Sequence, residues 1–269
     1  MGSGPLILIG AGNMGGAMLS GWLNSGRRGS DILVIDPGPR EALAALMAEK
    51  GAKHLTAAPQ GVTAGILFLA VKPQLIDSVV PPLASLVGPQ TVVVTVAAGK
   101  TLATLERHLG PAAMIRAMPN TPAMIGRGVT GAFANAQVTA AQKAAVQALL
   151  QVSGPVEWVE SEAEIDAVTA LSGSGPAYVF YLVECMAEAG RKAGLQADLA
   201  MRLARETVAG AGELLHRSPD DAATLRRNVT SPGGTTAAAL DVLMAETGMQ
   251  PLFDRAIAAA KTRAGELAG

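Results

Sequence analysis

Three glycines near the amino terminus are spaced to bring the backbone close to a phosphate group. Gly10, Gly12 and Gly15 follow an apolar run at residues 6–9 and lead into a segment whose apolar residues recur at helical spacing. In this pattern the first glycine permits a tight turn, the second lets the backbone approach a pyrophosphate, and the third allows close packing of helix on strand. The helix would present free N–H groups to the phosphates. The pattern predicts a dinucleotide site.

An acidic residue completes this pattern. Asp36 ends a second apolar run, at residues 32–35, about 20 residues after Gly15, where a group that binds the ribose 2′-hydroxyl is expected. Its charge would repel the 2′-phosphate of NADPH, whereas Arg40, four residues on, is placed to approach that phosphate. We expect a preference for NADH, with both NAD(H) and NADP(H) open as cofactors.

Alternating strands and helices must position these residues. Apolar and β-branched runs predict further strands at residues 65–71, 91–96, 113–116, 128–133 and 156–159. Helical spacing predicts helices at residues 39–50, 74–87 and 139–150, the last opened by a Thr139/Gln142 capping box. This alternation is typical of a doubly wound, Rossmann-type α/β sheet, which binds ligands at the carboxyl ends of its strands. Loops at 70–74, 97–99 and 116–122 leave that edge. Taken one by one, each fits an ordinary strand-to-helix turn better than a cofactor site. Taken together, the three fit a cofactor-binding edge as well as they fit ordinary turns.

The chain changes character near residue 160. Residues 1–160 predict the dinucleotide-binding domain, and residues 161–269 have helical spacing and no strand pattern. Ser161 and Glu164 are spaced as a capping box, and residues 172–175 should break the helix that they open. One following helix has an apolar face made of Val179, Leu182, Val183 and Met186. Such faces exceed what a small lone helical domain can hide, so we expect subunits to assemble.

A loop rich in glycine and hydroxyl groups stands between two predicted helices. Its sequence is Asn228-Val-Thr-Ser-Pro-Gly-Gly-Thr-Thr236. The adjacent glycines expose backbone N–H groups, and the Ser and Thr residues supply hydroxyls. Such a loop is suited to hold a small carboxylate at a helix N-terminus. A capped turn between helices is the simpler alternative.

Composition argues against several other classes of protein. The 269 residues are 49% hydrophobic and only 3% aromatic, and their charges form no like-signed run, so we expect neither a nucleic-acid nor a membrane partner. Cys185 is the only cysteine, which excludes an intramolecular disulfide, and we expect it in the core of a helical region. The three His residues are isolated, so no metal site is predicted. No signal peptide or membrane span is predicted, which favours a cytoplasmic location.

Taken together, five segments resemble those of the pyrroline-5-carboxylate reductase family. They are residues 9–15, 70–74, 116–122, 171–178 and 229–236, in the family's order and across the whole chain. The resemblance implies NAD(P)H-dependent reduction of 1-pyrroline-5-carboxylate to L-proline, the last step of proline biosynthesis. It also implies a helical dimerisation and substrate-binding domain, active sites built from two subunits, and a homodimer, with a further ring of dimers left open.

The resemblance also implies roles for individual residues. The substrate would be bound by Glu162, from the partner subunit, and by Asn228, Ser231, Gly234, Thr235 and Thr236. The cofactor would be bound by Gly10, Ala11, Gly12, Asn13, Met14, Gly15, Asp36, Ala70, Val71, Lys72, Pro73, Ala98 and Asn120. Thr236 would be the catalytic hydroxyl that hydrogen-bonds or protonates the ring nitrogen. Many family members have a small polar residue in place of Asp36, where it receives the extra phosphate of NADP.

This chemistry requires neither a metal nor a strong acid. A protonated imine is already electrophilic, so alignment of the nicotinamide and the substrate ring carries most of the catalysis. One rival is a β-hydroxyacid dehydrogenase, in which a helical Lys donates the proton; here Lys192 is the candidate, and its spacing from Glu188 suggests a surface pair. A second rival is a nucleotide-sensing module without turnover. Neither accounts for the loop at 228–236.

Overall fold

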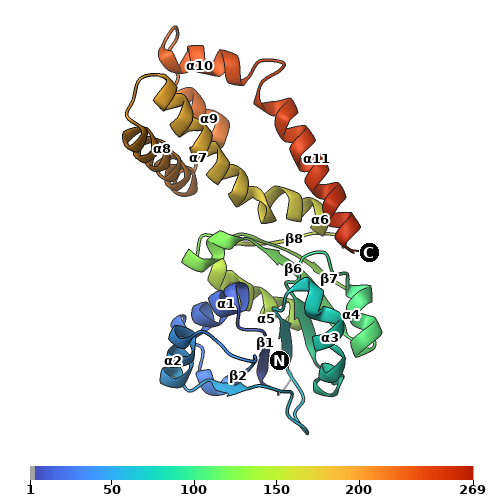
Figure 1. Ribbon diagram of the computed structural model, residues 1–269. Helices are drawn as coiled ribbons and strands as arrows, with labels where there is room; N and C mark the ends of the chain where they lie inside the picture. Colours follow the sequence, from blue (N-terminus) through green and yellow to red (C-terminus); the bar gives the residue numbers. More distant parts are fainter. Residues whose placement is uncertain (1–3, 269) are drawn as a thin grey trace. The chain divides into compact units, whose positions relative to one another are not determined.

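A computed structural model describes residues 4–268, and the chain divides into two compact units (Figure 1). The first unit is Met1–Ser174 together with Ala260–Gly269, and the second is Gly175–Ala259. The division falls later than residue 160 because the helical segment that follows packs on the sheet. A β-carbon on Gly131 would lie 2.5 Å from Val168, and one on Gly173 would lie 2.6 Å from Met118. Residues 161–174 therefore belong with the strands.

The first unit is built on one eight-stranded sheet of order β3-β2-β1-β4-β5-β6-β7-β8. The strands are β1 (Leu6–Ile9), β2 (Ile32–Ile35), β3 (Lys53–Leu55), β4 (Ile66–Leu69), β5 (Val92–Thr95), β6 (Ala113–Pro119), β7 (Thr130–Ala134) and β8 (Val156–Trp158). Every neighbouring pair is parallel except β6 and β7, which are antiparallel. The chain reverses its winding between β1 and β4, which confirms the doubly wound fold. In such folds ligands bind at the carboxyl ends of the strands at this point.

Helices cover both faces of this sheet (Figure 1). They are α1 (Asn13–Asn24), α2 (Glu41–Lys50), α3 (Ile76–Val79), α4 (Leu102–Leu109), α5 (Ala140–Leu150) and α6 (Glu164–Val168). Leu6 and Leu8 of β1 face the core formed with α1 and α5, whereas Ile7 and Ile9 face the core formed with α3 and α4. This alternation is the pleat of a strand buried on both faces, which explains its uninterrupted apolar run.

Two local predictions for the first unit were incomplete, and two short elements were not predicted. The helix predicted at 74–87 is short, because α3 is followed by a 3-10 segment, Pro81–Leu86, that opens with two prolines lacking N–H donors. β6 continues through Pro119 because its second half pairs with β7, which the sequence pattern did not indicate. β3 and α4 were not predicted; β3 is a three-residue strand with every side chain exposed, so it lacks an apolar pattern.

The second unit is helical, as predicted. Its helices are α7 (Gly175–Lys192), α8 (Ala197–Arg217), α9 (Ala222–Asn228), α10 (Thr235–Leu243) and α11 (Met249–Ala268), the last ending within the first unit. The break expected at residues 172–175 is instead a π-helical turn, Thr169–Gly173, between α6 and α7. Hydroxyls of Thr169 and Ser172 donate to the carbonyls of Ile165 and Val168, which supports this wider turn.

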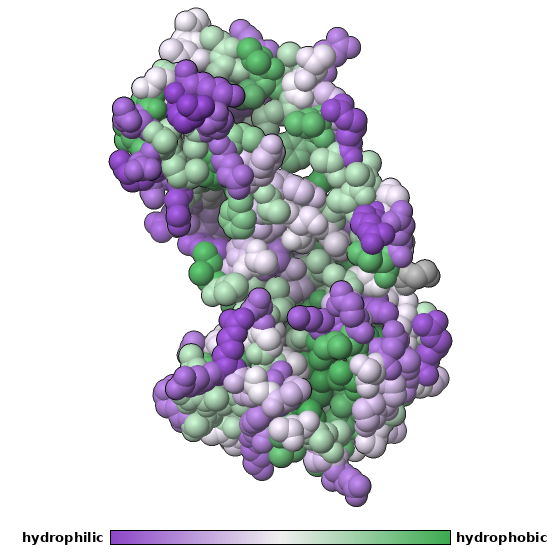
Figure 2. All heavy atoms as spheres, in the orientation of Figure 1, coloured by the Kyte–Doolittle hydropathy of each residue, from purple (hydrophilic) through white to green (hydrophobic). Residues whose placement is uncertain are grey.

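Apolar side chains lie on the surface of the second unit (Figure 2). Val179, Leu182 and Met186 of α7 are 45%, 38% and 36% exposed. Cys185 is exposed as well, so the prediction of a core position was wrong for the single chain. Among the described residues of this unit, the buried apolar side chains are all alanines: Ala187, Ala200 and Ala204. A unit with so little core needs another surface to cover it.

The described residues contain no helix that is both long and apolar enough to cross a membrane.

Candidate active site

The glycine-rich turn after β1 lies against the backbone that follows β4. Gly10 has a φ of +88°, and a β-carbon there would lie 2.9 Å from the carbonyl oxygen of Ala70. A β-carbon on Gly15 would lie 2.0 Å from the carbonyl oxygen of Gly10. Both positions therefore require glycine, and together they bring Gly10, Gly15 and Ala70 to one point of the sheet edge.

The amino terminus of α1 is open beside this turn. Gly12 caps the helix without a side-chain hydrogen bond, and Gly12 and Asn13 are exposed. A β-carbon on Gly12 would meet no atom within 4 Å, so the space over the helix end is free. The unpaired N–H groups of the first turn and the helix dipole favour an anion here. The cradle fits the pyrophosphate of a dinucleotide.

Charges of both signs lie at the β2 side of the turn. Asp36 accepts hydrogen bonds from the N–H of Ala11, at 2.7 Å, and from the N–H of Gly38, at 2.8 Å. Arg40 reaches across from the start of α2 and donates to the side-chain oxygen of Asn13. The structure thus brings Asp36 and Arg40 to the same turn, at the predicted ribose end.

The loops after β4 and β5 form the other side of the edge. Ala70 donates to the carbonyl of Ile9 at 2.8 Å, and Val71 lies beside Gly10. Lys72 is exposed and directly precedes the 3-10 helix Pro73–Leu75. After β5, Ala98 is half-buried in the loop that leads to α4. These residues leave neighbouring parallel strands, β4 and β5, at their carboxyl ends.

Two other predicted cofactor residues make contacts with the protein. Asn120 donates to the carbonyl of Ser172 at 3.2 Å and accepts from the N–H of Val129 at 3.0 Å. Its amide therefore joins the end of β6 to the π-helical turn. Met14 is half-buried against the core on the α1 face.

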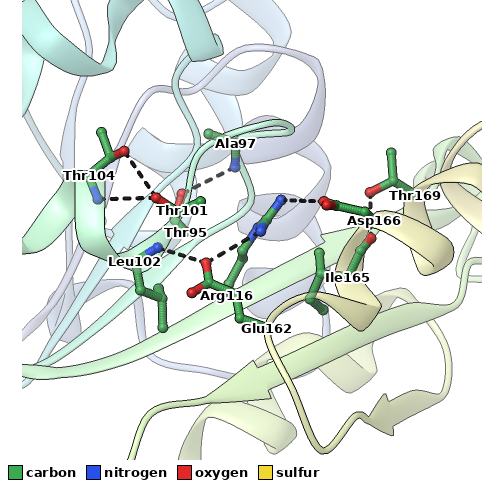
Figure 3. Close-up of polar contacts among 10 residues, drawn as sticks. All are labelled: Thr95, Ala97, Thr101, Leu102, Thr104, Arg116, Glu162, Ile165, Asp166 and Thr169. Carbon is green, nitrogen blue, oxygen red and sulfur yellow. Dashed lines mark hydrogen bonds and ion pairs between the residues drawn. The ribbon is translucent and has the colours of Figure 1, made fainter. Parts of the chain in front are cut away.

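Glu162 lies in the first unit, in a network that the sequence did not predict (Figure 3). Its Oε1 accepts from the N–H of Leu102, the first residue of α4, at 2.8 Å. The same oxygen lies 3.3 Å from Nη1 of Arg116, and Nη2 of Arg116 lies 3.2 Å from Oδ1 of Asp166. Arg116 is only 3% exposed, although it carries a charge on a central strand. The sequence feature that could have indicated this network is an Arg within an otherwise apolar strand.

Residues 228–236 belong to the second unit. Gly234 donates to the carbonyl of Ser231 at 3.0 Å, and Gly233 has a φ of +67°. Gly234 caps α10 without a side-chain hydrogen bond, so the helix has an open amino terminus. Ser231 and Thr235 are exposed, Thr236 is half-buried, and Asn228 ends α9. Backbone N–H groups and hydroxyls therefore gather at one helix end.

Taken together, the doubly wound sheet, the glycine-rich turn and the carboxylate after β2 define a dinucleotide-binding protein of the Rossmann class. Residues 6–99 match the family model described as NADP oxidoreductase coenzyme F420-dependent, and residues 162–267 match the model described as pyrroline-5-carboxylate reductase dimerisation. The chain carries a dimerisation domain and forms an oligomer.

Relatives extend this match over the whole chain. The pyrroline-5-carboxylate reductase of Pseudomonas aeruginosa is 42% identical, over 98% of this chain and 96% of its own length. The structure of the Coxiella burnetii pyrroline-5-carboxylate reductase has a TM-score of 0.92 at 35% identity, covering 99% of each chain. The Plasmodium falciparum pyrroline carboxylate reductase, solved with NADP bound, has a TM-score of 0.81 at 25% identity, covering 100% of each chain. The chain belongs to the pyrroline-5-carboxylate reductase family.

The glycine-rich turn gives a prediction with an internal control. Gly12→Ala should leave the melting temperature nearly unchanged, because its methyl group meets no protein atom, but should weaken dinucleotide binding by occupying the phosphate cradle. Gly15→Ala should lower the melting temperature by several degrees, since its methyl group collides with backbone. Thermal melting and cofactor titration by fluorescence measure the two effects. Tight cofactor binding by Gly12→Ala would contradict the proposed cradle.

Proposed function

We propose that this chain reduces 1-pyrroline-5-carboxylate to L-proline with NADH or NADPH. The observation that carries the proposal is the presence, in one member of this family, of both the open dinucleotide cradle and the open amino terminus of α10. The first suits a pyrophosphate, and the second suits the carboxylate of a small imino acid. The proposed location is the cytoplasm.

The dinucleotide would lie along the carboxyl edge of the sheet. Its pyrophosphate would be held by the turn and the start of α1, comprising Gly10, Ala11, Gly12, Asn13, Met14 and Gly15. Asp36 would bind the adenosine ribose. The nicotinamide and its ribose would be bordered by Ala70, Val71, Lys72, Pro73 and Ala98, with Asn120 nearby. Gly10, Gly15 and Ala70 support this path because their close packing leaves the helix end open.

The substrate would bind at the loop before α10. Its carboxylate would accept hydrogen bonds from the N–H groups of the first helical turn, aided by Ser231, Gly234 and Thr235. Asn228 would line the same pocket. Glu162 would approach from the partner subunit, so that each active site contains residues of two chains. The assembly proposed is a homodimer, and further association into a ring of dimers is part of the same proposal.

The chain's contribution to the reaction is alignment and hydrogen bonding. When bound, the reduced cofactor supplies a hydride from nicotinamide C4 to the imine carbon. The turn and the β4 and β5 loops would orient the cofactor ring, and the α10 loop would orient the substrate. The Thr236 hydroxyl would hydrogen-bond the ring nitrogen, as acceptor from a protonated imine or as donor to the product amine. Because the protonated imine is already electrophilic, a hydroxyl suffices.

Lys192, the candidate proton donor of the rival enzyme class, lies in a surface pair. In a β-hydroxyacid dehydrogenase a Lys from the helical half must reach the substrate. Lys192 is 69% exposed and lies 3.6 Å from Glu188, as an i,i+4 pair on α7. This surface pair supports the reductase instead.

The direct test is oxidation of NADH and NADPH by the purified oligomer with and without 1-pyrroline-5-carboxylate. The proposal expects substrate-dependent oxidation and formation of L-proline. Cofactor binding without turnover on any imine would favour the nucleotide-sensing alternative. Sedimentation of the same sample tests the assembly, because an active monomer at micromolar concentration would exclude the shared active site.

Thr236→Ala should lower kcat by roughly ten- to thousand-fold, because one hydrogen bond that strengthens in the transition state is lost. Cofactor affinity should barely change, since the cradle is in the other unit. Thr236→Ser retains the hydroxyl and should recover most of the activity. Steady-state kinetics with both variants measure this, and an unchanged kcat in Thr236→Ala would remove Thr236 from the mechanism.

Asp36→Ser should shift kcat/KM toward NADPH by about fivefold or more, since repulsion of a 2′-phosphate by a nearby carboxylate is worth on the order of 1 kcal/mol or more. The parent should prefer NADH. Asp31→Ser removes the same charge from an exposed position paired with Arg28 and serves as the control. A parent that strongly prefers NADPH, with a ratio unmoved by Asp36→Ser, would mean that Asp36 does not face the ribose.

A further inference from the structure

The β5–α4 loop, residues 96–101, is fixed at both ends by threonine side chains. Thr95 is fully buried at the end of β5, and its hydroxyl accepts from the N–H of Ala97 at 3.2 Å. Thr101 caps α4, because its hydroxyl accepts from the N–H of Thr104 at 3.3 Å. The loop contains Ala98, to which the proposed function assigns the nicotinamide.

The middle of this loop is backed by the end of α11. Gly99 has a φ of +66°, and a β-carbon there would lie 2.8 Å from the β-carbon of Leu267. These residues belong to the same compact unit. The loop therefore has little freedom to move toward α11.

Another contact fixes the loop where it enters α4. Glu162 Oε1 accepts from the N–H of Leu102 at 2.8 Å, and it lies 3.3 Å from Nη1 of Arg116 (Figure 3). A carboxylate at a helix amino terminus is favoured by the helix dipole as well as by the hydrogen bond. The side chain of Glu162 thus connects α4 to the central strand β6.

Arg116 is the buried end of this connection. It is paired in register with Thr95, so the loop begins beside it on the neighbouring strand. Its other amino group, Nη2, lies 3.2 Å from Asp166 on α6, which fixes the direction of the guanidinium. The side chain of Arg116 is 4% exposed, against 27% for Glu162 and 19% for Asp166. A planar guanidinium holds two carboxylates in set directions, which an ammonium cannot do.

We propose that Arg116 is a positioning residue for hydride transfer. It holds Glu162, Glu162 holds the amino terminus of α4, and the loop that carries Ala98 is thereby set against the nicotinamide. The inference rests on the proposed function for the placement of the nicotinamide. Arg116 is buried and acts only through its partners. Displacements of about 1 Å cost as much as a hundredfold in rate, so a small shift of the loop would be measurable.

The first test is Arg116→Lys, which keeps the positive charge but removes the planar guanidinium that contacts two carboxylates. We expect kcat to fall by about 10- to 100-fold, with the KM for the imino acid changed by less than about threefold. The deuterium isotope effect on kcat, measured with cofactor deuterated at both C4 positions, should rise because hydride transfer becomes slower. Arg28→Lys makes the same change in an exposed pair and should leave all three quantities unchanged.

Two carboxylate variants test whether Arg116 acts on α4 through Glu162. Glu162→Gln and Asp166→Asn each remove one negative charge from Arg116, but only Glu162 contacts Leu102. We expect Glu162→Gln to lower kcat and raise the isotope effect as Arg116→Lys does, and Asp166→Asn to affect the melting temperature more than kcat. The double variant Arg116→Lys/Glu162→Gln should be little worse than either single variant, because both break one connection. This pair remains informative if Arg116→Lys fails to fold.

Amide hydrogen exchange gives a readout without substrate or turnover. The peptide spanning residues 97–109 should exchange faster in Arg116→Lys and Glu162→Gln than in the parent, and not in Asp166→Asn. Normal kcat, isotope effect and exchange in Arg116→Lys, with only a lower melting temperature, would overturn the proposal. A raised substrate KM in Glu162→Gln with an unchanged isotope effect would also overturn it. A parent that does not reduce the imino acid refutes the proposed function instead, and the exchange result still decides whether Arg116 holds the loop.

Discussion

The close approach of the turn after β1 to the backbone after β4 is the constraint on which the rest of the site depends. With a hypothetical Gly15 β-carbon only 2.0 Å from the carbonyl oxygen of Gly10, any side chain there would force α1 away from the sheet. The helix would then lose its place beside β1, and its amino terminus would no longer open at the crevice. The same turn anchors Asp36 through the N–H of Ala11. The proposed phosphate cradle and the proposed ribose site are therefore parts of one turn, which two glycines hold in place.

Electrostatics at this edge is a balance between two charges rather than the property of one residue. Asp36 uses both carboxylate oxygens to hold backbone N–H groups, which orients its charge toward the turn. Arg40 donates to Asn13 over the start of α1 and so remains near the same space. A 2′-hydroxyl would meet the carboxylate, whereas a 2′-phosphate would meet both groups. Under the proposed function, the preference for NADH or NADPH would depend on both Asp36 and Arg40.

Local patterns predicted most of the fold, and contacts distant in sequence account for what they missed. β1, β2 and α5 follow from apolar runs and a capping box, and Thr139 and Gln142 make both hydrogen bonds of that box. The connection from Leu102 through Glu162 to Arg116 spans segments that no short window includes. The π-helical turn depends on hydroxyls that bond the preceding carbonyls, where glycines at 173 and 175 suggested a break. For the candidate site, the sequence proposed residues, and the structure shows which contacts hold those residues in place.

The two units differ in how much apolar surface each buries within itself. The first has large buried side chains on both faces of its sheet, including Trp22 and Phe68 in edge-to-face contact at 5.1 Å. In the described part of the second unit only alanines are buried among apolar residues, while Phe180 and Tyr181 are exposed. Burial is worth about 25 cal/mol per Å² of apolar surface, so helices that bury only alanines gain little when they fold alone. The second unit also contains the α10 loop. The second unit therefore gains stability from subunit association, and the match to a dimerisation domain agrees with this.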